Sequence, residues 1–159
     1  MSDARQMLRH TLATLAYRGG KAVRGAPDRF AGFKTEADIR TPGQILAHVG
    51  DLLDWALELA DGRPTWHDSP PRPWPEEVAR FFEALARLDA RLASEAPLVG
   101  FSAQQLFQGP VADALTHVGQ IAMLRRMFGS PVRGENYLKA EIVVGRVGPD
   151  QSAPRREFE

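Results

Sequence analysis

The sequence predicts an all-α protein, a four-helix bundle, and two observations carry that prediction. Four segments place apolar residues at the 3.6-residue period of an amphipathic helix, each with its own start and stop signals, while no segment alternates convincingly as a strand does. The composition, 43% hydrophobic and 25% charged over 159 residues, is that of one globular domain. We expect a single domain over 1–159, with a core over 2–130 and an extended tail from about residue 145.

The first helix is expected over residues 3–22, with Ser2 as its N-terminal cap. Gly19 and Gly20 weaken its end, because glycine is a poor helix former. The following segment, 24–40, has no periodicity and contains both proline and glycine. It is expected to be a long loop, and loops of this length often form lids or binding segments.

The second helix is expected over residues 41–61. Thr41 is its cap, Pro42 occupies the first turn, and Gln44 can complete a capping box by bonding back to the backbone of the cap. The buried stripe of this helix carries one polar residue, His48, between two apolar positions. That histidine is the first candidate for a functional role.

The third helix is expected over 75–95, where acidic residues at its start complement the helix dipole. The fourth is expected over 102–128, interrupted by Gly109 and Pro110, because proline lacks the backbone N–H that a helix needs. The remaining tail should hold a short C-terminal helix around 136–144 and then fray. No strand is expected.

The connection between the second and third helices constrains their directions. Residues 63–73 contain four prolines and must be extended. About 11 extended residues span up to roughly 36–40 Å, which exceeds the roughly 30 Å length of each helix. The two helices can therefore run parallel, in an up-down-down-up order, although the simple antiparallel order also fits this length.

Charge and cysteine content exclude several function classes. Lys plus Arg and Asp plus Glu both total 20, so no overall positive field attracts nucleic acid. The absence of cysteine removes disulfides, thiolate zinc sites and a cysteine nucleophile. With no apolar run long enough for a membrane span and a charged N-terminus unlike a signal peptide, we expect no membrane partner and a cytoplasmic protein.

Three residues could meet between the second and fourth helices. Asp113 and His117 are four residues apart and therefore share one helix face. At 1.5 Å per residue, antiparallel packing would bring His117 to nearly the height of His48 on the facing helix. The trio can be read as metal ligands or as a hydrogen-bonded pair without metal, since buried polar groups normally find partners.

The stretches "TPGQILAHVGDLLDW", with His48, and "DALTHVGQ", with His117, resemble the DinB/YfiT-like superfamily of small four-helix bundles. The resemblance implies an up-down-down-up order and a divalent metal ion at one end of the core. The family pattern His-x-x-x-His-x-Gly-Gln has Asp113 in place of its first histidine here. His48, Asp113 and His117 are thus the expected ligands of Zn, Ni, Fe or Mn, with a shift toward harder ions because an oxygen replaces a nitrogen.

The resemblance also implies a function: a metal-dependent transferase or hydrolase that uses a metal-activated low-molecular-weight thiol, or water, on a small-molecule substrate. No separate general base stands out, so the catalytic residues stay unknown. The alternative is a non-catalytic bundle that binds a small ligand or forms a homodimer, with the His and Asp side chains as a metal-free polar network.

Further residues could form a substrate pocket above His48. The loop 24–40 and the tail after Gly129 are expected at that end of the bundle, because they join or leave helix ends there. Four side chains are weaker candidates for the pocket wall, solvated or capping roles being the alternative: Tyr17, Arg18, Lys21 and Tyr137.

Overall fold

The computed structural model describes residues 1–159 and is mostly helical, which confirms the expected all-α class. Its helices begin and end within about two residues of the positions that the sequence predicts. Their bounds are Asp3–Val23 for α1, Pro42–Ala60 for α2, Trp74–Ala93 for α3, Ala103–Leu106 for α4 and Ala112–Met127 for α5. None of them is both long and apolar enough to cross a membrane.

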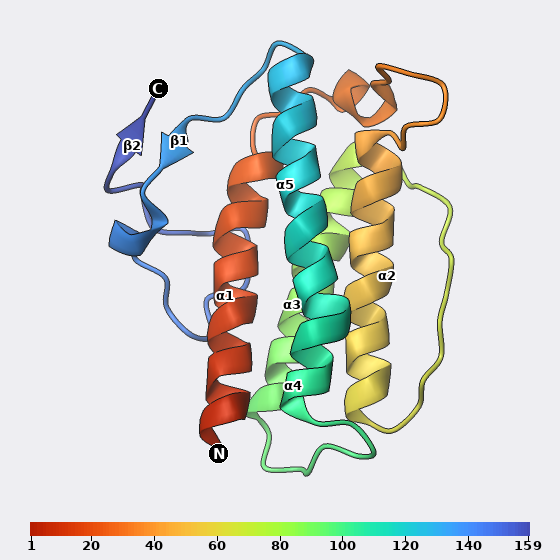
Figure 1. The fold of residues 1–159 in the computed structure, drawn as a ribbon, viewed down its shortest axis with the longest axis vertical. Coiled ribbons are helices and arrows are strands. Elements are labelled where there is room, and N and C mark those ends of the chain that lie inside the picture. The colour runs from red at the N-terminus through yellow and green to blue at the C-terminus, as the bar shows by residue number, and fades with distance from the viewer.

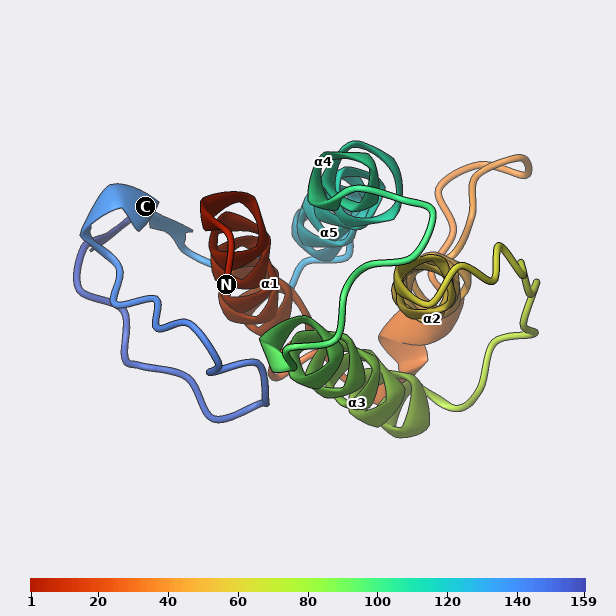
Figure 2. The same cartoon turned by 90° about the horizontal axis from the view of Figure 1, so that it is seen from below.

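The long helices lie side by side around a common apolar core, as the end-on view of Figure 2 makes clear. In Figure 1, α1 and the α4–α5 segment rise from the end that holds the N-terminus, whereas α2 and α3 descend toward it. The proline-rich connection after α2 runs back alongside α2, from its lower end to near its start, before α3 begins (Figure 1). An extended connection is therefore what allows α2 and α3 to run in the same direction.

The capping box predicted at Thr41 is confirmed, and a second box precedes α4. At the start of α2, the Thr41 hydroxyl accepts a hydrogen bond from the backbone N–H of Gln44 at 3.2 Å, and the Gln44 side chain accepts one from the Thr41 N–H at 2.9 Å. Ser102 and Gln105 make the same reciprocal pair before α4, at 3.2 and 2.9 Å. Each box satisfies backbone donors that a helix start would otherwise leave unpaired.

Two expected weak points do not end their helices. α1 continues through Gly19 to Val23, and a Cβ atom at position 19 would lie 2.6 Å from the Phe81 ring of α3. Glycine thus permits close packing between α1 and α3. At Gly109 and Pro110 the chain forms a π-helical turn, Phe107–Val111, which joins α4 to α5 without a break.

The loop after α1 is anchored by one aromatic side chain. Phe30, in the 3-10 helix Asp28–Gly32, is fully buried. Its ring packs edge-on against Trp74 and Phe128, with centroid distances of 5.4 and 5.3 Å. As predicted, the loop lies at the end of the molecule where α2 begins (Figure 1).

The C-terminal segment differs from its prediction. The helix expected around 136–144 is only one 3-10 turn, Tyr137–Lys139. Two short strands that were not expected, β1 at Gly134–Glu135 and β2 at Glu157–Phe158, pair antiparallel beside α1 (Figure 1). The tail also buries Val147 in the core. It does not fray, because backbone pairing and apolar burial hold it against the helices.

Candidate metal centre

His48 comes from α2, and Asp113 and His117 come from neighbouring turns of α5. The His48 Nε2 atom lies 3.7 Å from Asp113 Oδ2, and the His117 Nε2 atom lies 3.4 Å from Asp113 Oδ1. The two imidazole rings are 4.8 Å apart at their centroids and nearly perpendicular, at 89°. The structure therefore brings together all three residues that the sequence singled out as ligands.

The spacing of the three side chains suits a shared ion. One ligand atom from each residue can be chosen so that all three lie within 4.8 Å of one another. Two ligands bound at 2.0–2.2 Å can be at most about 4.4 Å apart. Both imidazole–carboxylate distances, one to each Asp113 oxygen, are below that limit, and the widest separation of 4.8 Å exceeds it by only about 0.4 Å. Two nitrogen donors and one carboxylate also suit zinc and related divalent ions.

The three residues lie in a groove between α2 and α5 and are not enclosed in the core. The side chains of His48 and His117 are 19% and 13% exposed, and that of Asp113 is 47% exposed. The Trp66 ring, from the connection after α2, packs against His48 at 5.6 Å and against Trp55 at 5.8 Å. The site is thus partly shielded by aromatic rings yet reachable from solvent.

A hydrogen bond orients the His117 ring. Its Nδ1 atom lies 2.7 Å from the side-chain oxygen of Gln120, one helical turn further along α5. Imidazoles that bind metals usually use their other nitrogen in such a bond, which holds the ring orientation. This arrangement leaves Nε2 facing Asp113. Sequence reasoning did not assign Gln120 this role, although its spacing of three residues from His117 was a sufficient signal.

The pKa of His48 lies below its ordinary value. Burial is the main cause, and the nearby His117 and the positive charge of Arg40 act in the same direction, while Asp113 opposes them. A lowered pKa keeps the imidazole neutral near pH 7. The neutral form is the one that can bind a metal ion.

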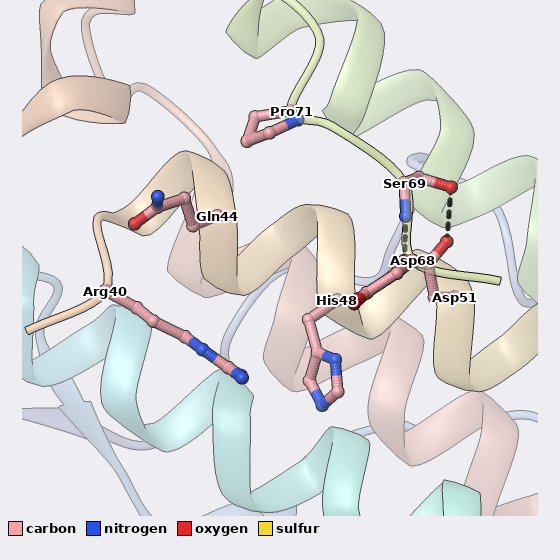
Figure 3. Close-up of a pocket in the computed structure, with 7 residues that line it drawn as sticks. All are labelled: Arg40, Gln44, His48, Asp51, Asp68, Ser69 and Pro71. Carbon is pink, nitrogen blue, oxygen red and sulfur yellow. Dashed lines mark hydrogen bonds between the residues drawn. The ribbon is translucent and has the colours of Figure 1, made fainter.

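Beside His48 lies a polar pocket of about 200 Å³, shown in Figure 3. It is bounded by α2, by the end of the first loop and by the connection before α3. Its lining residues are Arg40, Gln44, His48, Asp51, Asp68, Ser69 and Pro71. A second pocket, of about 320 Å³, borders His117 and Gln120 and shares Arg40 with the first. Ligand space is therefore present next to both histidines.

A buried ion pair builds the far wall of the polar pocket. Arg80 of α3 donates hydrogen bonds to Asp51 at 2.5 Å and to Asp54 at 3.0 Å. Asp51 also accepts two hydrogen bonds from Ser69, from its backbone N–H at 2.8 Å and its hydroxyl at 2.7 Å. Gly50 is required here, because a Cβ atom would lie 2.9 Å from the Arg80 guanidinium. No local sequence pattern indicates this group, because Asp51 and Arg80 lie on different helices.

The weaker pocket candidates gather elsewhere, between α1 and the C-terminal segment. The Tyr17 hydroxyl donates to Glu135 at 2.6 Å, and Lys21 pairs with the same carboxylate at 2.9 Å. Tyr137 packs its ring against Tyr17 at 6.2 Å and lies under the Arg18 guanidinium at 4.3 Å. The two pockets that border His48 and His117 contain none of the four candidates. In this structure the four candidate side chains instead anchor the C-terminal tail to α1.

Changing Tyr17 to Phe should weaken that anchor. Glu135 is buried, and the substitution leaves one of its carboxylate oxygens without the hydroxyl donor. Losing one partner of a buried hydrogen bond costs about 1–3 kcal/mol. We expect faster hydrogen exchange and faster proteolysis after Gly129, with α2 unaffected. Unchanged protection of the tail would contradict the anchoring role.

Comparison with protein-family models, curated proteins and solved structures found no match to this chain.

Proposed function

We propose that this chain is a DinB/YfiT-like four-helix bundle with up-down-down-up order, and that it binds one divalent ion through His48, Asp113 and His117. The helix directions in Figure 1 support the proposed order. The observation that carries the metal proposal is the approach of two imidazoles and one carboxylate, from two helices, to within 4.8 Å. The Gln120 bond to His117 adds support, because it holds the ring in an orientation suited to a ligand.

The proposed activity is metal-dependent transfer or hydrolysis on a small-molecule substrate. A bound divalent ion would lower the pKa of a thiol or water and so supply a nucleophile at neutral pH. The chain offers three ligands and no cysteine, which leaves room for an exogenous group. His48 stays neutral and available because its pKa is lowered, and Trp66 limits solvent access beside it.

The alternative is a non-catalytic bundle in which the three side chains form a metal-free network. A carboxylate paired with a charged imidazole normally approaches to about 2.7–2.9 Å. Here the two distances are 3.4 and 3.7 Å, longer than a network that exists for its own hydrogen bonds would have. The spacing therefore favours the metal proposal over the network.

Metal analysis of protein purified without a metal-binding tag tests the proposal. We expect up to one divalent ion per chain, and loss of most of it in His48→Ala and in His117→Ala, because each removes one of three ligands. His10→Ala is a matched control, since His10 is exposed on α1 and lies outside the site. Equal metal content in the wild type and the His48→Ala, His117→Ala double variant would refute all three assignments.

Activity needs a separate measurement. Metal-loaded protein and the His48→Ala variant should be screened with several thiols and with electrophilic or hydrolysable acceptors. We expect turnover by the wild type that disappears in the variant and after chelation. Metal binding without turnover across a broad panel would refute the proposed activity but not the metal site.

A further inference from the structure

Arg40 differs from the other arginines near α2. Arg80, Arg87 and Arg91 each pair with an aspartate, at 2.5–2.7 Å. The Arg40 guanidinium has no carboxylate partner in the chain, and its side chain is directed toward the His48 ring at the edge of the polar pocket (Figure 3). Its positive charge is therefore available to a ligand.

The position of Arg40 links both sides of the candidate metal centre. It borders the pocket beside His48 and also the pocket beside His117. Gln44, one turn into α2, lines the first of these and Gln120 the second. A small molecule with one group at the metal ligands would thus meet a guanidinium and an amide with its other end.

The surrounding charges define what that other end can be. Asp51 is already neutralised by Arg80 and by two hydrogen bonds from Ser69. Asp68 is exposed and lines the same pocket as Arg40. Arg40 is the only arginine or lysine that lines this pocket, and Asp68 adds a negative charge to the lining, so a ligand group with a single negative charge suits the pocket better than a doubly charged phosphate. The planar guanidinium fork matches a carboxylate in shape as well as in charge.

We infer that Arg40 binds the carboxylate of a small substrate whose thiol or other metal-binding group lies at His48, Asp113 and His117. This inference rests on the proposed function and deepens it by naming the chemical class of the substrate. Arg40 is then a positioning and specificity residue. It selects anionic over neutral molecules of the same length and leaves the metal ligands unchanged.

The test compares two thiols of equal chain length on cobalt-loaded protein, 3-mercaptopropionate and 3-mercapto-1-propanol. Binding is followed by the absorbance that appears when a thiolate binds cobalt. We expect the carboxylate thiol to bind about tenfold more tightly to the wild type, the effect of one charge-assisted hydrogen bond. In Arg40→Gln this ratio should fall to near one with cobalt content unchanged, and Arg40→Lys should restore part of it.

Two controls separate the role of Arg40 from general charge effects. Arg72→Gln removes the same charge from a neighbouring arginine that does not line the pocket, and should keep the tenfold preference. Asp68→Asn removes the opposing carboxylate and should keep or increase it. Equal affinity of the wild type for both thiols would overturn the role of Arg40 but leave the proposed function intact. Failure of the wild type to bind cobalt would overturn the proposed function and this inference together.

Discussion

Replacing Arg80 by methionine should lower the free energy of unfolding by about 3–5 kcal/mol, the usual cost of removing one partner from a buried ion pair. The Arg80 and Asp51 side chains are only 7% and 2% exposed. Without the guanidinium, the Asp51 carboxylate stays buried with only the Ser69 donors, and Asp54 loses a partner too. Methionine keeps most of the side-chain volume, so the loss of stability is due to the missing positive charge. Denaturant unfolding measures this change in the free energy of unfolding.

Arg87→Met is the matched control. Arg87, like Arg80, lies on α3 and pairs with Asp54, but its side chain is 49% exposed. Exposed pairs contribute about 0–1 kcal/mol, so this variant should be nearly neutral. A loss below about 1 kcal/mol in Arg80→Met would contradict the structural role of the buried pair.

Acid should act on the same ion pair. Burial opposes ionisation of Asp51, but the hydrogen bonds from Arg80 and Ser69 outweigh it and hold the pKa of Asp51 below its ordinary value of 3.8. A depressed folded-state pKa gives stability that is present above the unfolded pKa and is lost as the pH falls through the folded one. Between pH 5 and 2, the wild type should therefore lose more stability than Arg80→Met. Parallel pH curves would contradict this.

Changing Asp113 to histidine should tighten zinc binding by about tenfold or more. Position 113 is one helical turn from His117 and faces His48, so a histidine there offers a third imidazole to the same point. Zinc binds imidazole nitrogen well, whereas carboxylate oxygen suits harder ions. The preference for manganese relative to zinc should fall in parallel. Competition with a chromophoric chelator measures both affinities.

Met123→His is the matched control for that substitution. Met123 is exposed on α5 but lies six residues beyond His117, which is more than one and a half turns along the helix and on a different face. The added imidazole should change zinc affinity by less than about twofold. If Asp113→His binds zinc no better than the wild type, the three residues do not share an ion.

The sequence was sufficient to predict the helices because their signals are local. At Ser2, Thr41 and Ser102 the helix start is marked by a side chain that accepts a hydrogen bond from a backbone N–H three residues away. The buried faces follow from the 3.6-residue period. The pair Asp113 and His117 was predictable for the same reason, since four residues of helix bring them to one face.

Tertiary structure decided everything that depends on which segments meet. Tyr17 was considered for a substrate pocket, but it binds Glu135, which is 118 residues away in the chain. Arg80 reaches Asp51 across 29 residues, and Arg40 borders His117 only because α5 packs against the start of α2. No local period encodes such pairings, because their energy depends on burial and on charges brought together by packing. The sequence by itself determined the helices and the identity of the candidate ligands; the packed chain decided which charges are neutralised and which are left free.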